Sequence, residues 1–175
     1  MLNLKCSLCK VTQNLKKLVL IFLTLYIFLN INKSNPIMTI TEHLNQQDPT
    51  RLPLLQQLHA AILKNDPSVE PVVGSMMGKQ MILYNDRGHM KYALASVKDY
   101  MSLHVLPMYM NAPMHQKYEA LLPNAKIQKG CINFKDGGEM PLTVATALIT
   151  DCAPIDLIKI RQDYLDAKKK KPKKA

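Results

Sequence analysis

The feature that most constrains the fold is a pair of short apolar runs separated only by a tight-turn sequence. Residues 80–85 (QMILYN) and 91–96 (KYALAS) are rich in apolar and aromatic side chains, and residues 86–88 (DRG), within the five residues between them, supply a turn. Two strand-like runs joined so closely predict a β-hairpin. The next segment, 100–106 (YMSLHVL), alternates with a period of two and predicts a further strand. These segments together indicate an antiparallel sheet.

Helical patterns flank these strands in the sequence. Leucines at helical spacing predict a helix over residues 50–65, and prolines at the first turn open predicted helices over 113–122, 141–152 and 154–167. Residues 130–134 (GCINF) predict one more short strand. Strands joined by tight turns, with helices before and after them, favour packing of the helices on one side. We therefore predict an α+β fold, a two-layer sandwich with a mainly antiparallel sheet of four to five strands and helices packed on one face.

The positive charge of the chain lies at its two ends. The net charge is +10 over 175 residues, but residues 1–37 carry five lysines and residues 168–175 carry six, both without any acid. Residues 38–167 hold twelve lysines and arginines against thirteen acids, so the body is nearly neutral. This balance argues against nucleic acid as a partner of the folded body. An alternative is that the lysine-rich tail, which we expect to be disordered, associates with nucleic acid or another anionic surface.

Residues 18–29 (LVLIFLTLYIFL) form an almost continuous apolar run preceded by two lysines. That order is typical of a secretory signal, although no small-residue cleavage site follows it. The run is shorter than the roughly 20 residues that span a bilayer comfortably. Three interpretations of residues 1–37 stay open: a single membrane anchor through residues 18–31, a signal, or a true start at Met38. We expect a cytoplasmic protein, with the membrane anchor as the alternative.

Several segments of the body carry a resemblance to one protein family. They are the hairpin around Tyr84 and Tyr92, the strand YMSLHVLP at 100–107, a helix that ends in Leu121 and Leu122, and the stretch KIQKGCINFKDGGEMPLTVATALI at 126–149. On these segments, residues 54–150 resemble the YdhG-like domain family, a domain of unknown function. The resemblance implies an α+β fold akin to frataxin. It also implies, for some members, an intracellular iron chaperone that supplies iron for iron–sulfur cluster or haem assembly.

The iron role that the resemblance implies needs clustered carboxylates. Frataxin-type proteins carry such carboxylates along the first helix, whereas residues 50–65 contain neither Asp nor Glu. The remaining candidates for this alternative are Asp151, Asp156 and Asp163, and the last two share one helix face with Lys159 between them. Iron–sulfur assembly proteins would be the partners in that case. Otherwise the sequence predicts no cofactor.

The polar side of segment 100–106 gives the clearest local indication of a site. Ser102 and His104 alternate with apolar residues, so one sheet face is partly polar. If small and polar residues of neighbouring strands share that face, they form a shallow recess for a small ligand or peptide. The residues predicted to line it are Ala93, Ala95, Ser102, His104, Cys131 and Asn133. The alternative is an ordinary solvated sheet face.

The sequence lacks four common catalytic and nucleotide-binding motifs. It contains no Gly-x-Gly-x-x-Gly, no P-loop, no His-Glu-x-x-His and no Gly-x-Ser-x-Gly. Cys131 would act as a nucleophile only with a histidine such as His104 beside it in space. We therefore predict that the chain is not an enzyme but a YdhG-like module that binds an unknown protein partner or a small ligand on its sheet face.

Overall fold

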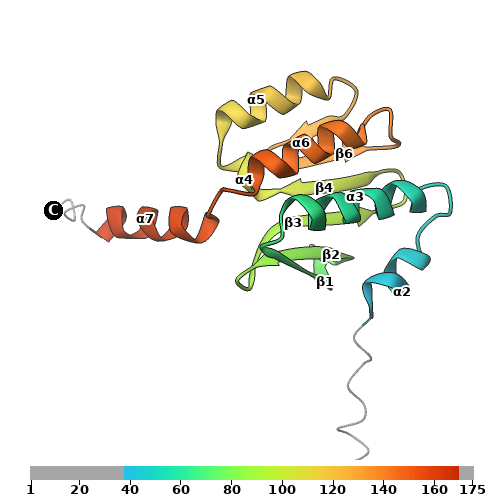
Figure 1. The fold of residues 1–175 in the computed structure, drawn as a ribbon, viewed down its shortest axis with the longest axis horizontal. Coiled ribbons are helices and arrows are strands. Elements are labelled where there is room, and N and C mark those ends of the chain that lie inside the picture. Colours follow the sequence, from blue (N-terminus) through green and yellow to red (C-terminus); the bar gives the residue numbers. More distant parts are fainter. Residues whose placement is uncertain (1–37, 170–175) are drawn as a thin grey trace, which may run out of the picture. The chain divides into compact units, whose positions relative to one another are not determined.

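The computed structural model describes residues 38–169. Six strands form a single sheet in the order β1-β2-β3-β4-β6-β5, and every neighbouring pair is antiparallel. Figure 1 shows the helices and strands along the chain. The elements are α2 (Ile40–Asn45), α3 (Leu52–Asn65), β1 (Val69–Met76), β2 (Lys79–Asp86), β3 (His89–Ser96), β4 (Met101–Val105), α4 (Leu106–Tyr109), α5 (Ala112–Leu121), β5 (Lys126–Gln128), β6 (Cys131–Phe134), α6 (Leu142–Cys152) and α7 (Leu157–Lys169).

The first three strands are joined by two tight hairpin turns. Two residues connect β1 to β2 and two connect β2 to β3, and all four have positive φ angles: Met77 53°, Gly78 73°, Arg87 48° and Gly88 78°. Positive φ at both turn positions is typical of a type I′ turn, whose twist matches that of antiparallel strands. The glycine at the second position of each turn adopts this conformation without steric cost. The turns therefore define the register of β1 with β2 and of the first pairs of β2 with β3, and a bulge shifts the β2–β3 register between Tyr84 and Asn85.

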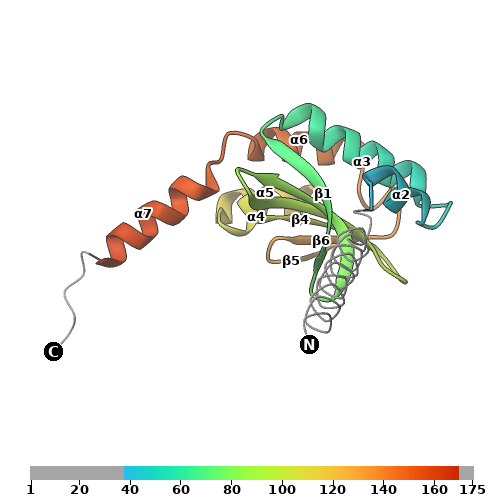
Figure 2. The same cartoon turned by 90° about the horizontal axis from the view of Figure 1, so that it is seen from below.

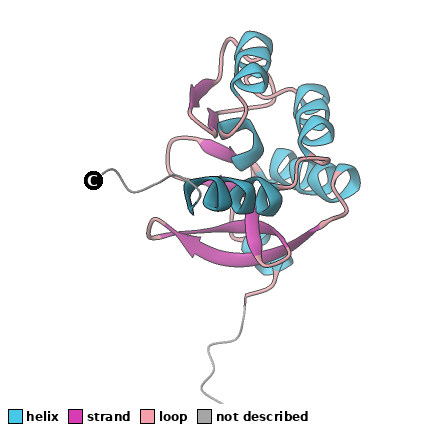
Figure 3. Cartoon of the chain, turned by 90° about the vertical axis from the view of Figure 1, so that its left-hand side faces the viewer, coloured by secondary structure: helices cyan, strands magenta, loops and turns pink. Residues whose placement is uncertain are grey.

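The helices α3 and α6 lie side by side over one face of the sheet, as Figures 1 and 2 show. Leu55, Leu58 and Ile62 of α3 are buried, and they follow the helical spacing seen in the sequence. They belong to the main core with Leu148 of α6 and with strand residues such as Leu103. Figure 3 shows helices, in cyan, packed along the right-hand side of the magenta strands. The α+β fold and its two-layer arrangement are thus confirmed.

The sheet has six strands, so the prediction of four to five was too low. The four segments predicted as strands are all strands, but β1 and β5 were not predicted. β1 contains Pro71 and Gly74, which weaken strand propensity, and β5 has only three residues. Both lie at the edges of the sheet, where a proline is tolerated and a short strand is common. Their pairing depends on a neighbouring strand rather than on a strong local pattern.

A buried ion pair joins the helix layer to the sheet. Asp66 follows α3 directly, and its Oδ2 lies 2.8 Å from Nζ of Lys91 on β3. The Tyr92 hydroxyl donates to the same oxygen at 2.7 Å. Lys91 Nζ also donates to the carbonyl of Ala153, just after α6, at 2.8 Å. One lysine therefore holds the C-terminal ends of α3 and α6 against the third strand.

The interpretations of the two ends fall outside the described residues. These are the anchor through residues 18–31, the signal and the lysine-rich tail beyond Lys169. Among residues 38–169, no helix is both long and apolar enough to cross a membrane.

Candidate functional site

The open face of the sheet, on the side away from α3 and α6, carries the predicted recess residues in two adjacent rows. Ala95 pairs with Ser102, which pairs with Asn133, in register across β3, β4 and β6. Ala93 pairs with His104, and His104 pairs with Cys131 in the next row. Because successive strand residues point to opposite faces, the residues between them, such as Leu103, belong to the core under the helices. The strand register thus brings all six predicted residues together.

Five of these six residues line one hollow of about 230 Å³, which we call the sheet-face hollow. They are Ala95, Ser102, His104, Cys131 and Asn133. Ala93 is fully buried and does not line it. The other wall comes from β1 and β2, where Met76, Met81 and Lys79 reach the hollow. The methyl group of Ala95 leaves room in the hollow, because a longer side chain at this position would fill the space.

His104 and Cys131 form a direct pair in this hollow. The distance from His104 Nδ1 to Cys131 Sγ is 3.0 Å. Burial raises the pKa of the Cys131 thiol and lowers the pKa of the His104 imidazole. Both shifts favour the neutral forms, so at neutral pH a neutral thiol and a neutral imidazole share this hydrogen bond. A nucleophilic cysteine needs the opposite shifts, toward thiolate and imidazolium.

Ser102 presents an unpartnered hydroxyl in the same hollow. This residue is only 4% exposed, and its Oγ has no hydrogen-bond partner among the described residues. A buried polar group left unpaired costs roughly 1–3 kcal/mol. A bound molecule with a donor or acceptor at this point would recover that cost.

A second, more polar hollow of about 430 Å³ adjoins the first. The two share Tyr100, Gln128 and Asn133. Lys126, Lys135 and Glu139 are among the other residues that line the second hollow. Tyr100 and Gln128 were not predicted as site residues. The sequence carried no signal for Gln128, because the short strand that places it was not recognisable.

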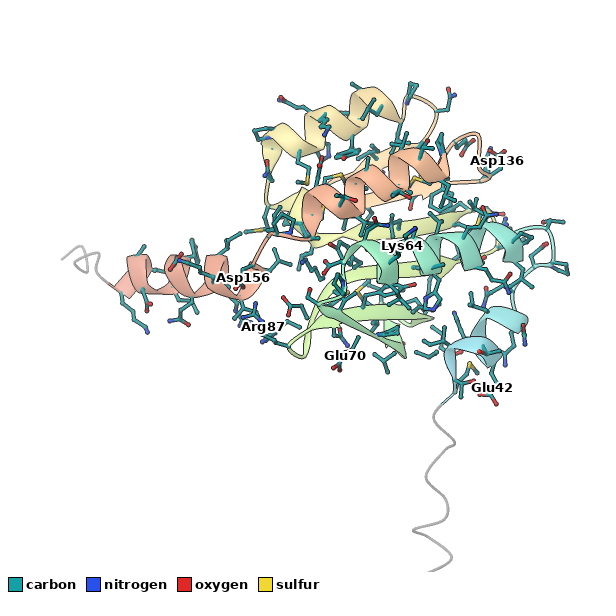
Figure 4. The ribbon with its side chains drawn as sticks, in the orientation of Figure 1. Glu42, Lys64, Glu70, Arg87, Asp136 and Asp156 are labelled. Carbon is teal, nitrogen blue, oxygen red and sulfur yellow. The ribbon has the colours of Figure 1, made fainter. Side chains whose placement is uncertain are left out.

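The three carboxylates proposed for iron do not form a cluster. Asp151 Oδ2 lies 2.6 Å from Lys117 Nζ, and the hydrogen bonds of Lys117 and Tyr118 lower the pKa of this carboxyl. Asp156 Oδ1 lies 2.7 Å from Arg87 Nη2, as Figure 4 shows for the two labelled side chains. Asp163 Oδ2 lies 2.8 Å from Lys159 Nζ, and both side chains of this pair are exposed.

The donor set therefore does not fit an iron site. Within residues 38–169, no group of three or more His, Cys, Asp or Glu side chains is arranged to hold a metal ion. Each of the three proposed carboxylates is instead neutralised by a lysine or arginine. Hard cations such as iron need several oxygen ligands that converge on one point.

Comparison with known protein families, with curated proteins and with solved structures found no match. The resemblance to the YdhG-like family and to frataxin stays a prediction that rests on the segments quoted from the sequence.

Proposed function

We propose that residues 38–169 form a non-catalytic binding module that holds a small ligand in the sheet-face hollow. The observation that carries this proposal is the Ser102 hydroxyl, which is buried at the wall of the hollow without a partner. Natural proteins rarely leave such a group unpaired, and those that do commonly satisfy it with water or a ligand. The variant Ser102→Ala distinguishes a ligand from water.

The lining of the hollow favours a compact molecule with one polar edge and one apolar side. Ser102, Asn133 and Gln128 supply hydroxyl and amide groups, which both donate and accept hydrogen bonds. Met76 and Met81 supply thioethers on the opposite wall, where they adapt to the shape of an apolar group. We therefore expect an uncharged or zwitterionic ligand that carries an amide, hydroxyl or heteroaromatic edge.

The state of the His104–Cys131 pair supports binding rather than covalent catalysis. A neutral thiol that is hydrogen-bonded to a neutral imidazole is a weak nucleophile, and both pKa shifts oppose proton transfer between the two. In a binding module the pair supplies a polar wall of fixed geometry. The imidazole Nε2 is then the group that can reach a ligand, since Nδ1 is occupied by the thiol.

The test is to purify the protein and compare its mass under native and denaturing conditions. A bound molecule that is lost on denaturation supports the proposal, and its identity follows from the mass difference. Asn133→Leu fills the hollow from a half-buried position and is expected to abolish this bound mass. Gln80→Leu, a similar amide-to-leucine change at an exposed position on β2 outside the hollow, is the control and is expected to keep it.

A second variant separates ligand from water. Ser102→Ala removes the buried hydroxyl, so the ligand-free protein is expected to become as stable as wild type or more stable, while the affinity for the ligand falls about tenfold. The proposal fails if no molecule copurifies and a library of small polar compounds raises the melting temperature of wild type and of Asn133→Leu equally.

A further inference from the structure

A second surface, unrelated to the sheet-face hollow, gathers most of the exposed apolar side chains. Among the described residues, ten large apolar side chains are exposed, and six of them lie on α4, just after it, or on α7. They are Leu106, Tyr109, Met110, Ile160, Tyr164 and Leu165. Soluble proteins rarely concentrate exposed apolar groups in this way unless the patch contacts a partner or a membrane.

All of these side chains except Leu165 line one groove of about 550 Å³, which we call the α4–α7 groove. Met90 at the start of β3 and Leu106 and Tyr109 of α4 line one side. Leu157 and Ile160 of α7 are among the residues that line the other side. No residue of α7 is buried, so this helix contributes little to the core. Its apolar side chains are therefore available for contacts outside the core.

The charges of α7 are sorted around the helix axis. At 100° per residue, Arg161 and Lys168 fall within the same arc as Leu157, Ile160 and Tyr164. Arg161 lines the groove with them. The two acids of the helix fall on the opposite side, where each pairs with a lysine of its own helix: Asp163 with Lys159 and Asp166 with Lys169. The side that bears the groove is thus both apolar and cationic.

The chain continues from this helix into more positive charge. Residues 168–175 contain six lysines and no acid. A second copy of the chain would bring a like-charged tail and the same cationic groove, so self-association is disfavoured. Nucleic acid would neutralise the lysines but would leave the apolar walls exposed. An anionic lipid surface satisfies both features, because its headgroups attract lysines and its acyl boundary accepts apolar and tyrosine side chains.

We propose that the α4–α7 groove and the lysine-rich tail together dock this protein on an anionic lipid bilayer. The tail supplies long-range attraction, and the rim of Tyr109, Met110 and Tyr164 inserts at the interface. Each lysine near such a surface raises the partition coefficient roughly fivefold. Neither component suffices alone, because the tail provides no apolar anchor and the groove provides little attraction.

The test uses the piece that starts at Met38, which contains every residue of the two core clusters and includes no part of the apolar run at 18–29. Cooperative thermal unfolding confirms that this piece is folded. Its binding is measured by cosedimentation with phosphatidylcholine vesicles, with and without phosphatidylserine. Binding is expected only where phosphatidylserine is present, and it is expected to fall steeply with added salt.

Two variants separate the components. Glutamine in place of Lys170, Lys171, Lys173 and Lys174 is expected to lower the partition coefficient more than a hundredfold. The double variant Ile160→Ser and Tyr164→Ser is expected to lower the partition coefficient at least tenfold. The control is Leu121→Ser, which changes a similarly exposed apolar residue outside the groove and is expected to leave the partition coefficient unchanged.

Three results would overturn the proposal. The first is equal binding to vesicles with and without phosphatidylserine, and the second is unchanged binding of the Ile160 and Tyr164 double variant. The third is tighter binding to duplex DNA or RNA than to phosphatidylserine vesicles at the same salt concentration, which assigns the tail to nucleic acid.

Discussion

Loss of the Asp66 carboxylate is expected to destabilise this domain more than any exposed change. The side chains of Asp66 and Lys91 are 1% and 2% exposed, and their charged atoms are 2.8 Å apart. Asp66→Asn leaves the lysine ammonium buried with only the Ala153 carbonyl and a neutral amide as partners. Removal of one member of a buried pair costs about 3–5 kcal/mol. For a domain of this size, that corresponds to a fall in melting temperature of roughly 10–20 °C.

The assay is urea unfolding followed by far-ultraviolet circular dichroism, with the free energy of unfolding extrapolated to water. The matched control is Asp163→Asn, which breaks the exposed pair with Lys159 and is expected to cost under about 1 kcal/mol. The double variant Asp66→Asn with Lys91→Met removes both buried charges and is expected to recover most of the loss, because no unpaired charge remains. A loss below about 1 kcal/mol for Asp66→Asn would refute the reasoning. So would a double variant no more stable than Asp66→Asn.

The same pair predicts how stability depends on pH. Burial by itself would raise the pKa of the Asp66 carboxyl, but hydrogen bonds from Lys91, Ser68 and Tyr92 outweigh burial and lower it. A carboxyl whose pKa is lower in the folded state stabilises the fold above its unfolded pKa of about 3.9. That contribution is lost as the pH falls from there through the folded pKa. The difference in stability between wild type and Asp66→Asn is therefore expected to be constant near neutral pH and to shrink below about pH 4.

Two further predictions concern the first hairpin and the thiol of the sheet-face hollow. Met77→Asn is expected to raise the free energy of unfolding by about 1 kcal/mol, because Met77 is 85% exposed and adopts a φ of 53° that Asn tolerates better. A melting temperature of this variant no higher than that of wild type would contradict the assignment of a type I′ turn. Cys131 is expected to react with iodoacetamide more slowly than a free cysteine at pH 7, because burial raises its pKa. Rapid alkylation at neutral pH, read by mass spectrometry with Cys131→Ser as the control, would instead indicate an activated thiol.

The sequence by itself determined the local elements of this fold. The residues 86–88 (DRG) predicted a tight turn, and the structure has positive φ at Arg87 and Gly88 in that hairpin. The period-two pattern of residues 100–106 separated Ser102 and His104 from the core residues Leu103 and Val105, because adjacent strand residues point to opposite faces. Helical leucine spacing likewise identified the buried side of α3. Such patterns are readable because they depend only on neighbours in the chain.

Pairings between distant segments were decided by the tertiary structure alone. β1 and β5 escaped prediction because an edge strand needs only one partner and tolerates weak strand formers. The sequence placed Asp156 and Asp163 on one helix face, but it did not show that Arg87, far along the chain, pairs with Asp156.

The contact between His104 and Cys131 exists because β4 pairs with β6 although two helices, α4 and α5, and the strand β5 lie between them in the chain. That register depends on how β4 and β6 pack under α3 and α6, which no local pattern encodes. The apolar stripe of α7 could be read from its spacing, but the groove that it forms with α4 depends on where the tertiary fold places the two helices. Chemistry at both sites thus arises from long-range packing, whereas the elements that carry it arise from local sequence.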